Sequence, residues 1–97
     1  MSETRTDEGL ERFRALVERV EREYFARHFP NYPPAVLEQS CNVRVHHGKR
    51  WVRVDVGSSG RYMIDTDGSI YGIKGYGVPH KGHRYGTLGD PRPLRRG

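Results

Sequence analysis

The stretch CNVRVHHGKRWVRVDVGSSGRYMIDTDGSIYGIK, residues 41–74, decides the fold because its apolar residues alternate with polar ones. Alternation with a period of two is the pattern of a strand that is buried on one face. Short segments rich in glycine and polar residues interrupt it at positions 48–49, 57–60 and 66–69, and each is typical of a tight turn. The stretch therefore predicts a four-stranded antiparallel β-meander.

Because side chains alternate across a strand, the meander has two chemically different faces. The apolar face collects Val43, Val45, Val52, Val54, Val56, Tyr62 and Ile64. The opposite face collects Arg44, His46, Trp51, Arg53, Arg61 and Met63. Arginines beside an exposed indole suit nucleic acid, since guanidinium groups neutralise phosphates and aromatic rings stack on bases. The alternative is that the C-terminal segment covers Trp51 and Met63 as part of a thin core.

An amphipathic helix is predicted before the meander, over residues 7–29, after a disordered lead at residues 1–6. Its apolar stripe follows steps of three and four through Leu10, Phe13, Val17, Val20 and Tyr24. Thr6 or Asp7 can cap the helix, and Pro30 ends it. We expect the stripe to pack on the apolar face of the meander, and a homodimer seam along the helix is the alternative.

After Lys74 neither period persists, because glycine and proline recur throughout the segment. Residues 75–97 are predicted to form a basic loop and tail, with a short strand near residues 84–88 as an option. A single helical turn is expected at residues 34–39. The expected fold class is α+β in a single domain: one long N-terminal helix packed on a four-stranded antiparallel β-meander, with a basic C-terminal loop and tail.

The charge of the chain is distributed unevenly. The 97 residues carry a net charge of +5. Residues 1–40 hold six arginines and eight acidic residues, a net −2, whereas residues 41–97 hold eleven basic and four acidic residues, a net +7. This asymmetry suggests one surface that meets nucleic acid or an acidic host protein surface.

Several classes of protein receive no support from the sequence. Cys41 is the lone cysteine, so no internal disulfide can form, and a cytoplasmic location is expected. No apolar run is long enough to span a membrane, and no membrane partner is expected. The pairs His46-His47 and His80/His83 offer too few ligands for zinc, and the Asp65–Ser69 turn lacks the later acidic ligand of a calcium loop. No cofactor or metal is predicted.

Catalysis is a minor alternative. His80, Lys81, His83, Arg84 and Tyr85 offer the base, acid and cation that a metal-independent ribonuclease needs. Nothing in their spacing requires that chemistry, since histidines in a basic loop are usually surface residues. The sequence therefore favours a protein that is not an enzyme.

The segment IYGIKGYGVPHKGHRYGTL, residues 70–88, resembles a segment of small accessory proteins of bacteriophages, notably those that infect actinobacteria. The resemblance covers about the last third of the chain and the preceding hairpin. It implies a phage origin and action in the cytoplasm of a host bacterium. It implies no activity and no site residues.

The leading prediction is a non-enzymatic phage accessory protein that binds a polyanion, most plausibly DNA or RNA, through the basic sheet face and the tail. The runner-up is a protein-binding module that inhibits or redirects a host protein or machine. A structural component of the virion is a further alternative beside the ribonuclease. The predicted contact residues are Arg44, Trp51, Arg53, Arg61, Lys74, Lys81, Arg84 and Tyr85.

Overall fold

The computed structural model describes residues 5–75 and 77–92, and it is an α+β fold with two helices and one antiparallel sheet. The six strands of the sheet lie side by side in chain order, so every neighbour is also the next strand in sequence. The elements are α1 (Asp7–His28), α2 (Pro34–Cys41), β1 (Val43–His47), β2 (Val52–Val56), β3 (Ser59–Ile64), β4 (Ser69–Gly75), β5 (Val78–Thr87) and β6 (Asp90–Pro91).

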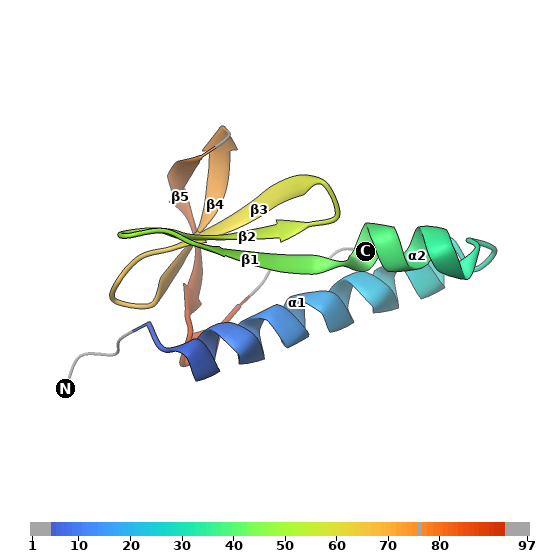
Figure 1. Cartoon of the computed structure of the whole chain (residues 1–97), viewed down its shortest axis with the longest axis horizontal. Helices are drawn as coiled ribbons and strands as arrows, with labels where there is room; N and C mark the ends of the chain where they lie inside the picture. Colours follow the sequence, from blue (N-terminus) through green and yellow to red (C-terminus); the bar gives the residue numbers. More distant parts are fainter. Residues whose placement is uncertain (1–4, 76, 93–97) are drawn as a thin grey trace.

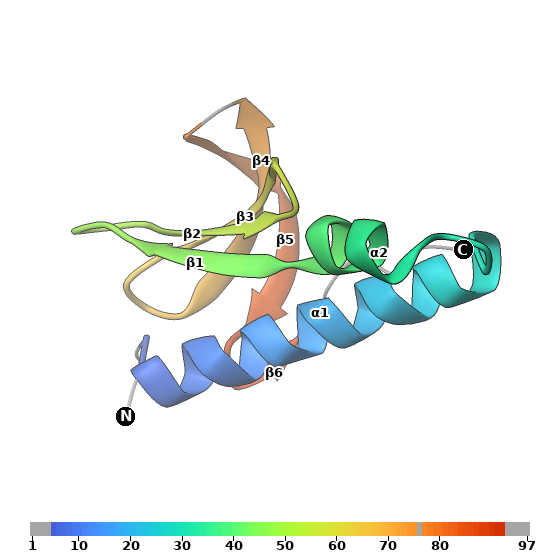
Figure 2. The ribbon, with the colours of Figure 1, turned by 45° about the vertical axis from the view of Figure 1, so that its right-hand side comes forward.

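The sheet is strongly twisted. In Figure 1, α1 runs along one side of the sheet beside β1, while the paired strands β4 and β5 project away from the helix at one end. In Figure 2, the other end of β5 turns back toward α1, and β6 lies beside the helix; α2 packs beside the C-terminal half of α1. None of the helices in the described part of the chain is long and apolar enough to cross a membrane.

The limits of α1 follow from its capping residues. The Thr6 hydroxyl accepts a hydrogen bond from the backbone N–H of Gly9 at 3.0 Å, which satisfies one of the free donors at the start of the helix. The helix ends at His28, with Phe29 as its C-cap. The predicted helix over residues 7–29 is therefore confirmed to within one residue.

The predicted lead at residues 1–6 is only partly within the described chain. Residues 1–4 lie outside it. Arg5 is held in place, because its backbone N–H donates to the carbonyl oxygen of Thr66 and its guanidinium donates to the carbonyl oxygens of Arg50 and Ile64. Arg5 therefore joins the start of α1 to the sheet.

The core lies between α1 and one face of the sheet, here called the helix face. Phe13 is 1% exposed and meets the ring of Tyr62 edge to face, with ring centroids 5.2 Å apart. The predicted packing of the helix stripe on the meander is confirmed, and its buried residues are not available for a homodimer seam. The core cluster consists of Leu10, Phe13, Val17, Val43, Val52, Val54, Val56, Tyr62, Ile64, Ile70 and Leu88.

The predicted count of four strands is wrong, because residues predicted as loop and tail form β5 and β6. The missed strand is irregular. Tyr71 pairs with Arg84, but the next residue of β4, Gly72, pairs with His80. Residues 81–83 are therefore extra on the β5 side, and they break the alternation that would have revealed a strand. Tyr76 and residues 93–97 of the predicted tail lie outside the described residues.

The C-terminal half of β5 closes the core. Tyr85 packs against Tyr62 with ring centroids 5.3 Å apart, and it approaches β4 at Gly72. A Cβ atom at Gly72 would lie 3.2 Å from Cε2 of Tyr85, so the close approach needs a glycine there. Leu88, just after β5, is 6% exposed and lies against the first turn of α1 at Gly9.

Arg61 lies on the helix face, and its predicted place beside Arg53 on the opposite face is wrong. The register of β2 and β3 shifts so that Val54 pairs with Tyr62 and Asp55 with Gly60, which leaves Arg61 as the extra residue of a β-bulge. Its guanidinium reaches Glu21 of α1 at 2.8 Å, and the Glu21 side chain is only 3% exposed.

We expect Arg61→Gln to lower the free energy of unfolding by about 3 kcal/mol, because it removes the guanidinium that pairs with the buried Glu21 carboxylate at 2.8 Å. Urea denaturation measures this. Arg12→Gln, which removes the same charge from an exposed site on α1, is the matched control and should change stability by less than about 0.5 kcal/mol. A loss as small as that of the control would contradict the structural role of Arg61.

Candidate nucleic-acid interface

The face of the sheet opposite α1, here called the outer face, carries a row of side chains that crosses five strands. His46 of β1 pairs with Arg53 of β2, which pairs with Met63 of β3; Met63 pairs with Tyr71 of β4, and Tyr71 with Arg84 of β5. Directly paired residues share a face. At a spacing of about 4.8 Å between strands, the row extends about 19 Å.

An aromatic platform lies beside this row. We give this name to the partly exposed rings of Trp51 and Tyr71, which meet edge to face with centroids 5.9 Å apart. The guanidinium carbon of Arg50 lies 5.0 Å from the centroid of the Trp51 ring. A cation over an indole face is held by a cation–π interaction, and the arrangement places a positive charge next to two stacking surfaces.

Asp65 holds the Arg50 guanidinium in its place over the Trp51 ring. Its Nε and Nη2 atoms donate to the two carboxylate oxygens of Asp65, both at 3.3 Å. The Arg50 guanidinium lowers the pKa of Asp65, and the backbone N–H of Thr66 adds to this effect. The carboxylate raises the pKa of Arg50 in turn. Arg50 therefore stays charged and in position.

The sequence left two alternatives for Trp51 and Met63, exposure on a binding surface or burial, and each alternative holds for one of the two residues. Trp51 is partly exposed, as a binding surface requires, whereas Met63 is buried at 5% exposure. Met63 does not belong to the core cluster on the helix face. Beside it on the outer face, Ile73 extends over Gly60, where a Cβ atom would lie 3.0 Å from its Cδ1. The floor of the outer face is thus apolar and closely packed.

The positive charge of Arg53 is balanced locally. Its Nε donates to Asp55 at 2.9 Å, and His46 lies 3.1 Å from the other carboxylate oxygen. Asp55 is 7% exposed. The outer face is therefore less basic than the sequence predicts: Arg50 is likewise paired, with Asp65, and Arg84 contributes an exposed positive charge.

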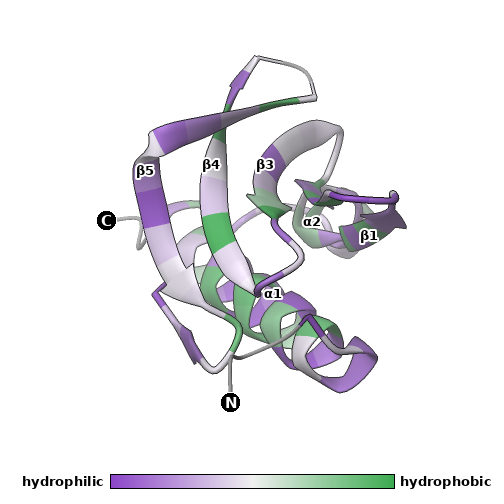
Figure 3. Cartoon of the chain, turned by 90° about the vertical axis from the view of Figure 1, so that its left-hand side faces the viewer, coloured by the Kyte–Doolittle hydropathy of each residue, from purple (hydrophilic) through white to green (hydrophobic). Residues whose placement is uncertain are grey.

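The remaining predicted contacts do not lie together. Lys74 is exposed near the end of β4, and Lys81 is exposed among the extra residues of β5. Arg84 belongs to the row and donates to the hydroxyl of Ser69 at 3.3 Å. In Figure 3, β5 is largely hydrophilic, in keeping with its histidines and cations.

Two of the predicted contacts are separate from the outer-face row. Tyr85 packs on the helix face against Tyr62, so its ring is not part of the platform. Arg44 donates to the carbonyl oxygen of Gly57 at 2.7 Å. It lines a polar hollow of about 530 Å³ near the start of β1, together with Gln39, Ser40, Asn42, Gly57 and Ser58.

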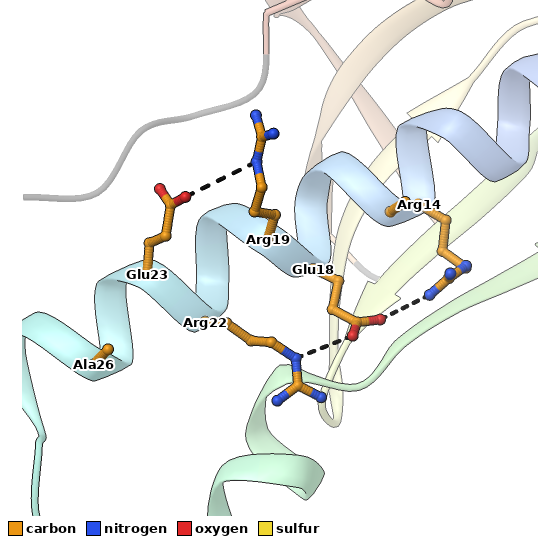
Figure 4. Close-up of a pocket in the computed structure, with 7 residues that line it drawn as sticks. Arg14, Glu18, Arg19, Arg22, Glu23 and Ala26 are labelled. Atoms are coloured by element: carbon orange, nitrogen blue, oxygen red, sulfur yellow. Dashed lines mark hydrogen bonds and ion pairs between the residues drawn. The ribbon is translucent and has the colours of Figure 1, made fainter.

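A second hollow, of about 400 Å³, lies on α1 over Ala15 and Ala26. Figure 4 shows the Arg19–Glu23 ion pair on one side of it and Glu18 between Arg14 and Arg22 on the other. The cations around this hollow are paired with carboxylates, so it offers little net charge to a polyanion. Its ion pairs instead suit an exposed helix surface.

A third hollow, of about 310 Å³, contains two arginines, Arg84 and Arg92, beside Gly86 and Thr87. Arg92 pairs with Asp90 at 3.2 Å in the same hollow. Arg84 also belongs to the outer-face row, so the hollow adjoins that row, and its positive charge comes from Arg84 because Asp90 balances Arg92.

The residues considered for a ribonuclease or a metal site are only partly assembled. The rings of His80 and His83 lie 4.1 Å apart, and Nδ1 of His80 is buried with no hydrogen-bond partner in the described chain. Tyr85 lies on the helix face. Within residues 5–75 and 77–92 no three His, Cys, Asp or Glu side chains gather as a metal site would require.

Comparisons with protein-family models, with curated proteins and with solved structures found no match to this chain. The assignment of the site therefore depends on its geometry.

Sequence reasoning missed Tyr71 and Arg50 as parts of the site. Tyr71 joins Trp51 only through the register of two strand pairs, β2–β3 and β3–β4, which alternation alone does not determine. Arg50 belongs to the β1–β2 turn, and its place over the indole depends on the position of Asp65. The one signal in the sequence for Arg50 was its position next to Trp51 at the end of the predicted hairpin.

We expect Asp65→Asn to reduce stability at neutral pH. The pKa of Asp65 is lowered in the folded protein, so its contribution is present above the ordinary aspartate value of about 4 and is lost as the pH falls below it. The difference in unfolding free energy between wild type and Asp65→Asn should be constant from about pH 5 to 8 and shrink below about pH 4. Arg50→Gln should remove the same acid dependence. A constant difference down to pH 2 would contradict this origin.

Proposed function

We propose that the chain is a non-enzymatic protein that binds single-stranded DNA or RNA across the outer face. The observation that carries the proposal is the aromatic platform of Trp51 and Tyr71, with Arg50 over the indole and Arg84 at the end of the same row. Bases stack on aromatic rings only when they are free of a duplex, so the platform favours single strands.

The charge of the chain supports the same proposal. The net charge of +5 would attract a polyanion over several ångströms and speed its association. Phosphates would meet the side chains of Arg50 and Arg84, while Lys74 and Lys81 would contribute from the projecting end of β4 and β5. The resemblance of residues 70–88 supports an accessory protein of a bacteriophage as the biological setting.

Binding should be measured by the fluorescence of Trp51, which is the lone tryptophan of the chain and therefore reports on the platform directly. We expect a single-stranded oligonucleotide to quench it. Affinity should fall steeply with salt. The slope of the logarithm of the binding constant against the logarithm of the salt concentration should decrease in magnitude by about 0.7 for each phosphate contact removed. Arg50→Gln with Arg84→Gln should lower the slope by about 1.4.

The matched control is Arg12→Gln with Arg27→Gln, which removes two exposed arginines of α1 on the other side of the core. This control lowers the net charge by the same amount as the outer-face double variant, and it should leave most of the salt dependence of the affinity unchanged. Affinity that does not change between low and physiological salt, or equal slopes for the two double variants, would contradict binding at the outer face.

A second candidate function is the binding of a protein through an aromatic tip, which we define as Tyr24, Phe25, His28, Phe29 and Tyr32. Their rings contact one another, with centroids 4.5 to 6.1 Å apart, at the turn between α1 and α2. Phe29 is 39% and Tyr32 40% exposed. Aromatic rings exposed together are typical of protein interfaces.

This candidate predicts that a protein partner recovered after nuclease treatment is lost by Phe29→Ser with Tyr32→Ser. The platform variants Arg50→Gln with Arg84→Gln should retain it. Affinity capture followed by mass spectrometry compares the variants, and circular dichroism checks that each is folded. Retention of the same partner by the tip variant would contradict a role for these rings.

A further inference from the structure

The outer face holds one imidazole in a defined orientation. Asp55 is 7% exposed, and its two oxygens are used by different neighbours: Oδ1 accepts from Nε of Arg53 at 2.9 Å, and Oδ2 lies 3.1 Å from Nε2 of His46. The carboxylate is therefore fixed by the sheet itself, since Asp55 and Arg53 share a strand and His46 is directly opposite Arg53.

The 3.1 Å contact with Asp55 favours Nε2 as the nitrogen that carries the proton of a neutral His46. An ionised carboxylate can only accept hydrogen bonds, so the contact is favourable when Nε2 carries the hydrogen. In the neutral imidazole the other nitrogen, Nδ1, then keeps its lone pair and is an acceptor. Asp55 thus makes His46 a hydrogen-bond acceptor through Nδ1.

His46 is placed to meet a bound strand. Its side chain is 46% exposed, and it forms the β1 end of the row that continues through Arg53, Met63 and Tyr71 to Arg84. A strand that stacks bases on Trp51 and Tyr71 and runs along the row would bring its sugar–phosphate backbone to this end.

We propose that His46, positioned by Asp55, makes the outer face select RNA over DNA by accepting a hydrogen bond from a ribose 2′-hydroxyl. This inference rests on the proposed binding of single strands. The other contacts do not distinguish the two nucleic acids, because ring stacking reads the base and the arginines read the phosphate. The 2′-hydroxyl is the donor that RNA has and DNA lacks, and a fixed acceptor is the group that recognises it.

The test uses three single strands of one sequence: RNA, DNA and 2′-O-methyl RNA. The last keeps the oxygen of the ribose but has no hydrogen to donate. Binding is followed by quenching of Trp51 at pH 8, above the range in which histidine ordinarily titrates. We expect RNA to bind about fivefold more tightly than either of the other strands, which is the ratio that one neutral hydrogen bond provides.

Two variants distinguish the presence of the imidazole from the placement of its proton. His46→Ala should lower the affinity for RNA to that for DNA and leave the affinity for DNA unchanged. The matched control is His47→Ala, because His47 pairs with Val52 and so shares the helix face, and it should keep the preference. Asp55→Asn offers an amide N–H to Nε2, which moves the proton to Nδ1. Nδ1 can then only donate, so this variant should lose the preference for RNA over 2′-O-methyl RNA although the imidazole is still present.

Thermal denaturation of each variant confirms that it is folded at the temperature of the assay. Equal binding of RNA and 2′-O-methyl RNA by wild type would overturn the inference and leave the proposed function standing. A preference for RNA that survives in His46→Ala would also overturn it, and so would a preference for RNA over 2′-O-methyl RNA that Asp55→Asn retains. Failure of all three strands to quench Trp51 would instead contradict the proposed function.

Discussion

The apolar stripe of α1 packs on one face of a six-stranded sheet, and the rest of the structure depends on this contact. It buries Phe13 against Tyr62 and collects the valines of β1 and β2 into one core. It also leaves the opposite face without a covering helix. Side chains of that face that are buried must be covered or paired by neighbours within the sheet. This requirement determines which side chains of the candidate site stay exposed.

The outer face meets this requirement in two ways. Met63 and Ile73 form an apolar floor, which is dense because Gly60 lets Ile73 approach. Polar groups that become buried are paired, as Asp55 is with Arg53 and His46. Trp51 and Tyr71 remain partly exposed above this floor. Tyr71 lies directly opposite the buried Met63, and its edge-to-face contact with Trp51 orients the two rings relative to each other.

Much of the fold could be predicted because its signals are local. The valines of β2 alternate, the stripe of α1 repeats at helical spacing, and Thr6 marks its start. Only the end of β5 was predicted, as the optional short strand near residues 84–88, because three extra residues and two glycines obscure the period of the rest. The bulge that turns Arg61 toward Glu21 was also hidden, since a shift in register leaves no trace in composition.

The candidate site was predictable to a smaller extent. Trp51 and Arg84 were expected on the binding surface from their residue types alone. Tyr71 and Arg50 join them only through strand pairing and through Asp65, both of which are tertiary contacts. Tyr85 shows the reverse case. Its residue type suits stacking on a base, but the open space at Gly72 draws its ring toward the core instead.

The ion pairs along α1 have a consequence for folding during synthesis on the ribosome. The helix is synthesised before the strands, yet its apolar stripe packs on residues from Val43 through Leu88, which leave the ribosome later. Before those residues are available the helix has no sheet to pack on, and the hydrogen bonds that Arg14 and Arg22 donate to Glu18 favour the helix by a few tenths of a kcal/mol each. The strands can then join hairpin by hairpin, because each neighbour is the next in sequence. The first turn of α1 is thus covered only when Leu88, which follows β5, reaches Gly9.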